Sequence, residues 1–354
     1  MQTVLVTGAA GTVGNYVVSL AEAAGYRVIA TDTSAKGISV PVRGEVRAGD
    51  LRDSAFMARL VKGVDLVIHT AALLDVGTPY EALRAVNTDA VVMLHEMASA
   101  AGAKRFVHTS SAMLYALGQK GALSESAPVE ARGPHGRSKR EAEQLLEART
   151  GKGAPWTIVR AAPLYGRRGR HFAAILLALG PAARLTTPVL PRPAGGPTHN
   201  FVHAEDVARA LVHVVGREDC EHKYFNVADE DPLSLGARVA ETYRAYGLHT
   251  LPAGELPRGV LDRVGQLCQA PGAYQSLDTA LLAAWRLVVL RHGLKTALRA
   301  RVDREALTLL YDDLVLDTSA LRATGWRPRF PRFAEGWRQV LRWYQAERWA
   351  PRYV

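Results

Sequence analysis

Three glycines, Gly8, Gly11 and Gly14, separate a short apolar segment from a helical one. In such a turn the first glycine allows a tight bend, and the second lets the backbone approach a pyrophosphate. The third allows the helix to pack closely on the strand, and the helix N-terminus then faces the phosphates. The stretch predicts a dinucleotide-binding loop that includes Thr12 and Val13. A tight turn without a ligand is the alternative.

A carboxylate, Asp32, stands 18 residues after the last of these glycines, at the end of the second predicted strand. A carboxylate there accepts hydrogen bonds from the adenosine ribose hydroxyls and repels a 2′-phosphate. Asp32 therefore favours NAD over NADP as the cofactor. An exposed aspartate that only caps a helix is the alternative.

Segments with strand and helix patterns alternate around these residues. Predicted strands cover 3–7, 27–31, 44–48, 65–69, 104–109 and 156–160, and predicted helices cover 13–24, 54–61, 79–101 and 135–150. Short strands separated by helices are typical of a parallel sheet that helices cover on both faces. The fold class is therefore α/β, with a Rossmann-type doubly wound parallel sheet.

The pattern changes after Gly166, where prolines cluster and the order of segments becomes irregular. A strand over 200–202, a helix over 204–215 and a strand over 224–227 suggest that the chain returns to the sheet. From Ser234 onward the pattern is mainly helical. We therefore predict a dinucleotide-binding domain over 1–166 with 200–228, and a smaller, mainly helical substrate lobe over 167–199 and 229–354.

The composition is consistent with two lobes, since 48% of the 354 residues are hydrophobic. Two cysteines cannot build a disulfide framework, which favours a reducing compartment. The N-terminus lacks a basic region, and its apolar segment ends in glycines, unlike a signal peptide. No apolar segment reaches the roughly 20 residues that span a bilayer. We expect a cytoplasmic protein without an integral membrane span.

The net charge of +10 is concentrated near the C-terminus, where residues 279–354 hold 14 Lys and Arg against 7 Asp and Glu. No nucleic-acid module is visible, so we expect no nucleic-acid partner. Residues 281–301 have the pattern of a basic amphipathic helix, with leucines at 287, 290, 294 and 298 and cations at 291, 295 and 299. Such a helix either packs on the protein core or associates weakly with a membrane surface.

The motifs together give a resemblance that extends over almost the whole chain. They occur in order at residues 7–14, 32, 49–51, 69–72, 87, 109–115, 160–166, 200–208 and 317–328. The chain resembles the extended short-chain dehydrogenase/reductase superfamily, which contains nucleotide-sugar epimerases, dehydratases and 3β-hydroxysteroid-dehydrogenase-like enzymes. This resemblance implies further NAD contacts from Asp50, Leu51, Ala71, Ala72, Asn87, Lys139 and Pro163. It also implies a homodimer formed through the helices at 79–101 and 135–150.

The resemblance implies three catalytic positions, and one of them departs from the family. Ser111 matches the residue that polarises the substrate oxygen, and Lys139 matches the lysine of the Tyr-x-x-x-Lys pair. The tyrosine position holds His135 instead. An imidazole, which ordinarily titrates near pH 6.5, is mainly a neutral base at neutral pH and a poor acid for ketone reduction. His135 can be the working acid–base group, Tyr115 or Tyr165 can replace it, or the usual redox step is lost.

Three functions remain open from the sequence. The first is an NAD-dependent oxidoreductase that acts on a secondary alcohol or ketone of a small molecule, with an apolar substrate as one option. The second is an NAD-dependent nucleotide-sugar epimerase or dehydratase. The third is a non-redox enzyme or a binding protein that senses NAD(H). We expect no metal site, because His199 and His203 are four apart on a predicted strand and so lack the spacing of a chelating helix face.

Overall fold

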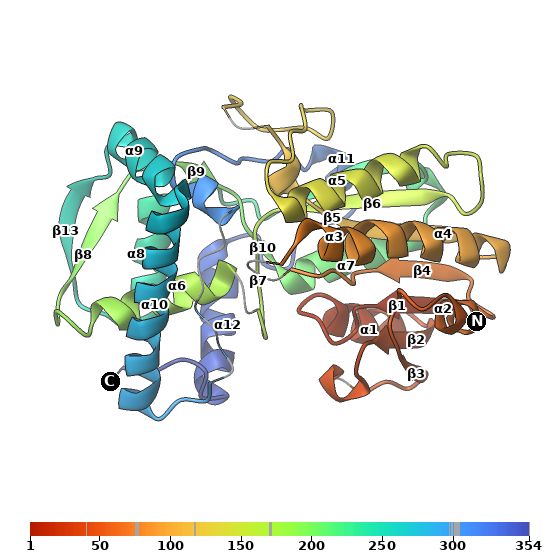
Figure 1. Ribbon diagram of the computed structural model, residues 1–354, viewed down its shortest axis with the longest axis horizontal. Coiled ribbons are helices and arrows are strands. Elements are labelled where there is room, and N and C mark those ends of the chain that lie inside the picture. The colour runs from red at the N-terminus through yellow and green to blue at the C-terminus, as the bar shows by residue number, and fades with distance from the viewer. Residues whose placement is uncertain are drawn as a thin grey trace.

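The computed structural model describes residues 1–39, 41–74, 78–116, 118–169, 172–296, 298, 300 and 305–353. The chain forms two lobes that lie side by side, the sheet-containing lobe on the right and a mainly helical lobe on the left of Figure 1. None of the helices in the described ranges is both long and apolar enough to cross a lipid bilayer.

The first lobe contains a seven-stranded parallel sheet with the order β11-β6-β5-β4-β1-β2-β3. Its strands are β1 Thr3–Thr7, β2 Arg27–Asp32, β3 Glu45–Ala48, β4 Leu66–His69, β5 Arg105–Ser111, β6 Trp156–Ala161 and β11 Lys223–Val227. The chain moves from β1 toward β3 in one direction and from β4 toward β6 in the other. The order therefore reverses between β1 and β4, and in such sheets ligands bind outside the carboxyl ends of the strands at this point.

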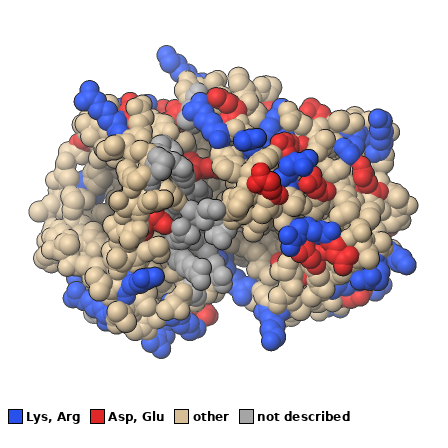
Figure 2. Space-filling model, in the orientation of Figure 1, with Lys and Arg blue, Asp and Glu red and all other residues tan. Residues whose placement is uncertain are grey.

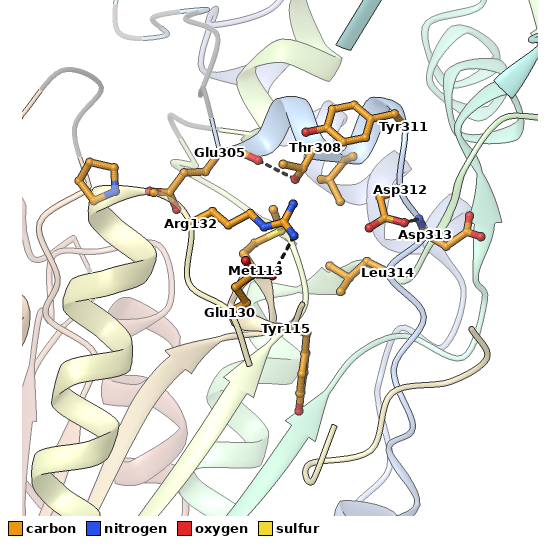
Figure 3. Close-up of a pocket in the computed structure, with 14 residues that line it drawn as sticks. Met113, Tyr115, Glu130, Arg132, Glu305, Thr308, Tyr311, Asp312, Asp313 and Leu314 are labelled. Atoms are coloured by element: carbon orange, nitrogen blue, oxygen red, sulfur yellow. Dashed lines mark hydrogen bonds and ion pairs between the residues drawn. The ribbon is translucent and has the colours of Figure 1, made fainter. Parts of the chain in front are cut away.

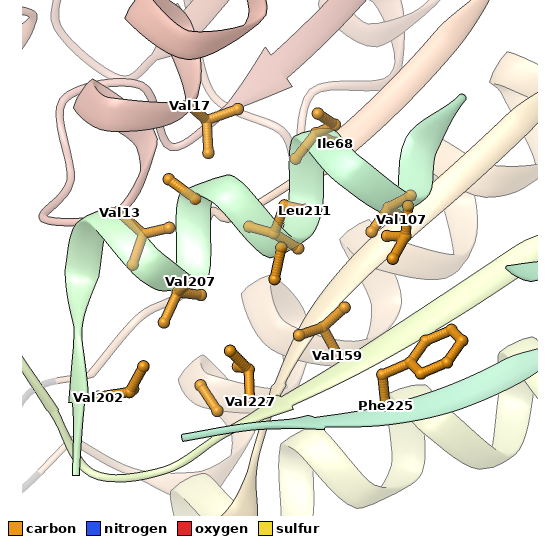
Figure 4. Close-up of a cluster of buried hydrophobic side chains, with 14 of the residues drawn as sticks. Val13, Val17, Ile68, Val107, Val159, Val202, Val207, Leu211, Phe225 and Val227 are labelled. Atoms are coloured by element: carbon orange, nitrogen blue, oxygen red, sulfur yellow. The ribbon is translucent and has the colours of Figure 1, made fainter. Parts of the chain in front are cut away.

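Helices cover both faces of this sheet, and the side chains of each strand divide between them. Val4 and Val6 of β1 pack with α1 and α7 in one core cluster, whereas Leu5 packs with α2, α4 and α5 in another. Figure 4 shows α7 lying on the first of these faces, with Val207 and Leu211 beside Val159 of β6. This alternation follows from the two-residue period of a strand.

The helices of this lobe are α1 Gly14–Ala23, α2 Ser54–Leu60, α3 Tyr80–Arg84, α4 Ala90–Ala100, α5 Pro134–Glu147 and α7 Ala204–Val215. Short 3₁₀ turns occur at η1 Ala35–Gly37, η3 Ala112–Leu114 and η4 Glu218–Cys220. A π-helical turn, η2 Ala85–Asp89, joins α3 to α4. The helix predicted over 79–101 is therefore present, with a π turn inside it at Asn87.

The second lobe packs its helices around a separate core cluster that contains Trp337, Tyr344, Leu177 and Trp285. Its helices are α6 Phe172–Ala183, α8 Leu235–Tyr246, α9 Arg258–Gln269, α10 Pro271–His292 and α12 Phe333–Ala346. Two further helical segments, η5 Ala306–Leu310 and α11 Ser319–Ala323, place Leu309 and Leu321 in the core cluster of the first lobe. Paired short strands complete the chain: β8 Leu190–Ala194 with β13 Thr250–Glu255, β7 Leu164–Tyr165 with β10 Val202–His203, and β9 Thr198–His199 with β12 Leu233–Ser234.

The predicted fold class is confirmed, since the parallel sheet, its covering helices and a mainly helical second lobe are all present. One predicted element is wrong in its extent. The basic amphipathic helix expected over 281–301 ends at His292, because Gly293 adopts a left-handed φ of +56° and terminates it. Leu298, predicted to belong to the apolar side of this helix, lies beyond its end and is only 2% exposed.

Candidate active site at the carboxyl ends of the strands

The glycine loop lies where β1 and β4 end, at the reversal of strand order. Gly8 has a φ of +70°, and a Cβ there would stand 2.6 Å from the backbone nitrogen of Ala71. A Cβ on Gly14 would stand 2.0 Å from the Gly8 carbonyl oxygen. Neither position tolerates a side chain, so both glycines are required for this close path of the backbone.

The start of α1 is suited to an anion. Val13 occupies the N-cap position without a side-chain hydrogen bond, and the first turn carries no acidic residue. The N-terminal N–H groups and the positive end of the helix dipole therefore favour a phosphate. Together with the compact glycine loop, this arrangement fits the pyrophosphate of a dinucleotide.

Asp32 lies at the end of β2 with its carboxylate against the glycine loop. Its Oδ2 accepts a hydrogen bond from Ala10 N at 3.0 Å, and its Oδ1 accepts one from Thr33 N at 2.8 Å. Thr33 Oγ1 donates a second hydrogen bond to Oδ1 at 3.3 Å. Because Oδ2 can accept a second hydrogen bond, the side chain can support the loop and still receive a ribose hydroxyl.

Replacing Asp32 with alanine is expected to narrow the preference for NAD(H) over NADP(H) by about tenfold or more, since a hydrogen bond to a charged group contributes about 1.5–3 kcal/mol. Calorimetric titration with both cofactors measures this ratio. Asp53→Ala is the control, because Asp53 is a carboxylate that only caps α2. An unchanged ratio in Asp32→Ala, or a wild type that prefers NADP(H), contradicts this interpretation of Asp32.

Asn87 is one of the remaining residues that the sequence predicts to contact the cofactor. Asn87 is fully buried and exchanges hydrogen bonds with the backbone of Leu73, Leu73 N donating at 2.7 Å and Asn87 Nδ2 donating back at 2.9 Å. Its Nδ2 also lies 3.1 Å from Ser138 Oγ. Asn87 thus ties the loop after β4 to α5.

Asp50 follows β3, beside Leu51, and pairs with Arg52 at 2.5 Å. Ala71 and Ala72 follow β4 beside the glycine loop. Pro163 follows β6, and its carbonyl accepts a hydrogen bond from Val202 N at 3.1 Å. All of these residues therefore lie at the carboxyl edge of the sheet, where their predicted role in cofactor binding remains a proposal.

Lys139 lies inside α5, beneath the end of β5. Its Nζ donates a hydrogen bond to the carbonyl oxygen of Thr109 at 2.8 Å, two residues before Ser111. Burial lowers the pKa of Lys139 to about 8, and Glu143 opposes this effect in part. Glu143 is fully buried and holds Arg160 of β6 through two hydrogen bonds of 3.0 and 2.8 Å. This ion pair fixes α5 against the sheet and keeps Lys139 in position.

Ser111 is the last residue of β5. Its Oγ accepts a hydrogen bond from Met113 N at 3.1 Å. A hydroxyl that accepts from the backbone can still donate its own proton. The hydroxyl of Ser111 can therefore still act as a hydrogen-bond donor at the end of β5.

His135 is the second residue of α5, one helical turn before Lys139. Its backbone N–H donates to Glu305 Oε1 at 2.9 Å, and the next N–H, of Gly136, lies 3.2 Å from Glu305 Oε2. The imidazole Nδ1 lies 3.8 Å from the same carboxylate. Glu305 therefore caps α5 and stands within ion-pair range of the ring when the ring carries a proton.

The sequence analysis did not identify Glu305. It lies 170 residues from His135 along the chain, and no motif marks it. Only the folding of the segment at 305–314 over the end of β5 brings it to the site.

The two tyrosines considered as replacements for His135 point elsewhere. Tyr115 donates from its hydroxyl to Asn226 Oδ1 at 2.7 Å, and burial raises its pKa. Tyr165 is fully buried in the core of the second lobe, and burial raises its pKa well above the ordinary value. Neither hydroxyl suits an acid–base role at neutral pH, which leaves His135 as the candidate.

A cavity of about 370 Å³ opens beside these groups. It begins at Ala112 and Met113, directly after Ser111, and at Gly133 and Pro134, directly before His135. Figure 3 shows Arg132 pointing into it, while Tyr115 points away toward the sheet.

The opposite wall of the cavity comes from the segment that follows Glu305. Apolar groups, among them Leu309, Tyr311 and Leu314, alternate there with Asp312 and Asp313. The only described cation on the wall, Arg132, donates to Glu130 at 2.8 Å. The described wall is therefore apolar and acidic, with one cation that is already paired.

Comparisons with known proteins identify the family and the fold. The model of the NAD dependent epimerase/dehydratase family matches residues 4–228. A UDP-glucose 4-epimerase of Streptomyces lividans is 28% identical over 298 residues, covering 77% of this chain and 89% of that protein. A 3-diazoavenalumate denitrifying reductase of a Streptomyces species is 28% identical over 352 residues, covering 94% of this chain and 98% of that protein.

Among solved structures, the dTDP-glucose 4,6-dehydratase DesIV of Streptomyces venezuelae, with NAD bound, superimposes with a TM-score of 0.70. The two chains are 21% identical, and the match covers 99% of each. At this identity the likeness establishes the fold and no more.

Proposed function

Because the chain belongs to the NAD-dependent epimerase/dehydratase family, we propose that it is an NAD-dependent oxidoreductase that acts on a secondary alcohol or the corresponding ketone. The observation that carries the proposal is the buried Lys139, held on the Thr109 carbonyl below Ser111, with His135 one helical turn away. A cationic group, a hydroxyl donor and a proton-transfer group then converge at the end of β5, next to the cavity.

The residues present fit the family's cofactor. The glycine positions that exclude a Cβ and the uncapped start of α1 suit the pyrophosphate, and Asp32 suits the adenosine ribose. NAD, when bound, supplies the acceptor or donor of a hydride.

The chain's own residues would bind the substrate oxygen and transfer its proton. Ser111 would donate a hydrogen bond to that oxygen and fix its direction. His135 would take the proton when an alcohol is oxidised and return it when a ketone is reduced. The positive charge of Lys139 would stabilise negative charge that develops on the oxygen, and Glu305 would hold the first turn of α5 in place.

A nucleotide-sugar epimerase or dehydratase is the second candidate, and the named relatives favour it. Such a substrate carries a diphosphate, which proteins commonly bind with arginine pairs. On the described wall of the cavity, Arg132 is paired with Glu130 and four carboxylates are present. This chemistry favours a substrate without a diphosphate, and we therefore place the oxidoreductase first. The homodimer implied by the resemblance stays a prediction.

Cofactor retention and ligand-induced thermal shifts separate the candidates. We expect the purified protein to exchange NAD(H) freely, and we expect apolar ketones to shift its melting temperature in the presence of NADH. NAD⁺ that stays bound through purification, with a shift on UDP-glucose or dTDP-glucose, would establish the epimerase instead. NAD binding without turnover of either class would point to a sensing protein.

A further inference from the structure

The outer side of the second lobe carries an apolar strip that the fold leaves uncovered. On α9, Val260, Val264 and Leu267 are exposed, Leu267 to 66%. Their spacing of four and three residues places them on one side of the helix. Among the described residues, most of the large hydrophobic side chains that are exposed lie between 251 and 290. Exposed apolar side chains are common singly, but a contiguous strip usually marks an interaction site.

A second exposed strip lies on α10, the longest helix of the protein's described part. Leu287 and Leu290 are 56% and 78% exposed, and Ala280 and Ala283 are exposed with them. At about 100° of rotation per residue, these four side chains fall within an arc of about 80°. The other side of α10 is buried in the lobe through Trp285 and Val288. We call the two exposed strips together the α9–α10 face.

Cations border this face. Arg286 and Arg291, both exposed, flank the apolar arc of α10, one on each side, within about 40° of it. Arg263 is likewise exposed beside the strip on α9. Asp278 is the single acidic residue in the sequence of α10, and it is buried. Figure 2 shows this side of the second lobe as largely uncharged, with Lys and Arg gathered at its lower edge.

The side of α9 that faces the protein interior packs against a residue that lines the cavity. A Cβ on Gly265 would stand 2.1 Å from the ring of Tyr311, so helix and ring are in direct contact. Tyr311 lines the cavity beside the candidate catalytic residues. The α9–α10 face and the cavity therefore lie on the two sides of one helix.

We propose that the α9–α10 face docks the protein onto an anionic lipid surface. Aliphatic side chains bordered by arginines are the composition of helices that lie in the membrane interface, where apolar burial and attraction to anionic headgroups act together. No residue of the α9–α10 face lines one of the main cavities in the described part of the protein. A protein partner usually anchors aromatic or arginine side chains in such pockets, whereas a bilayer requires only apolar area and cations.

The docking is expected to be reversible and sensitive to salt, because screening weakens the attraction of the arginines. It would bring the substrate cavity close to the lipid surface without any segment crossing the bilayer. The inference is independent of the proposed reaction, since it depends on residues that line neither the glycine loop nor the cavity.

The test is co-sedimentation of the full chain, saturated with NAD, with vesicles of phosphatidylcholine alone or of phosphatidylcholine and phosphatidylglycerol in equal parts. We expect binding to the anionic vesicles at low salt and little binding to the neutral ones. The double variant Leu287→Ser/Leu290→Ser should lower the partition coefficient by about tenfold or more. Replacing Arg286 and Arg291 by glutamine should lower it by about fivefold for each cation.

Val46→Ser/Val189→Ser is the matched control, because both valines are exposed and lie outside the face. It should bind vesicles like the wild type, and every variant should keep its affinity for NAD as a check of folding. Absent binding of the wild type to anionic vesicles, or equal binding by the leucine variant, overturns the proposal. So does sedimentation showing that the leucine variant dissociates a dimer, which would assign the face to a second copy of the chain.

Discussion

Replacing His135 with alanine is expected to lower kcat by about 10²- to 10⁴-fold, the usual contribution of a positioned general acid–base group. The loss should appear in kcat and not in cofactor affinity, because His135 lies at the start of α5 and away from the glycine loop. The measurement is kcat as a function of pH in the oxidation direction, for the wild type and the variant. A pH dependence that is present in the wild type and absent from the variant would assign the proton transfer to His135.

Two further variants test whether His135 itself transfers the proton. His135→Tyr is expected to retain or restore activity, because Lys139 and Ser111 stand where the family pattern places them. Ser111→Ala should cost less than His135→Ala, since the hydroxyl only orients the substrate oxygen. Undiminished turnover in His135→Ala would show that another group carries the proton. Because Tyr115 and Tyr165 are engaged or buried, a bound water would then be the first group to examine.

Replacing Lys139 with methionine is expected to reduce kcat by about 10²-fold or more, because the cation nearest the end of β5 is lost. The same variant should be more stable than the wild type at pH 7. Lys139 is buried, and its pKa falls from 10.5 to about 8 on burial. A shift of this size corresponds to at most about 3.5 kcal/mol, since each pKa unit is about 1.4 kcal/mol.

The direction of the pH dependence follows from proton binding. Between pH 8 and 10.5 the unfolded chain holds a proton on Lys139 that the folded chain has released, so the wild type gains stability as the pH rises. The stability advantage of Lys139→Met should therefore be full below pH 8 and vanish toward pH 10.5. Chemical unfolding of both proteins across this range measures the difference. Arg140→Met, a substitution on the same helix at a less buried cation, serves as the control. A constant difference across this range would mean that the Lys139 ammonium carries no burial cost.

The sequence alone determined those features that depend on residues close to one another along the chain. The glycine spacing, the short apolar run of Val4, Leu5 and Val6, and the 3.6-residue period of the helices are all local signals. They predicted the strands of the parallel sheet, the dinucleotide loop and the position of Asp32. The family pattern added Ser111, His135 and Lys139, because each follows a recognisable element at a short and regular distance.

Local backbone conformation adds features that periodicity does not show. A π turn at 85–89 lies inside one predicted helix without ending it, where Asn87 contacts both Leu73 and Ser138. The left-handed conformation of Gly293 ends α10, although leucines continue at helical spacing beyond it. A periodic pattern shows which side chains share a face, but it does not show whether the backbone keeps its hydrogen bonds.

Only the tertiary structure decided which partners those residues meet. Glu305 reaches the first turn of α5 from 170 positions away, and Tyr115 turns its hydroxyl to Asn226 of β11, two strands away from β5. Leu290 and Leu298 both belong to the predicted apolar strip, yet one is 78% exposed and the other 2%. Such differences arise from packing between segments that are distant in sequence. Contacts of this kind are set by the balance of burial over the whole chain, which no local pattern contains.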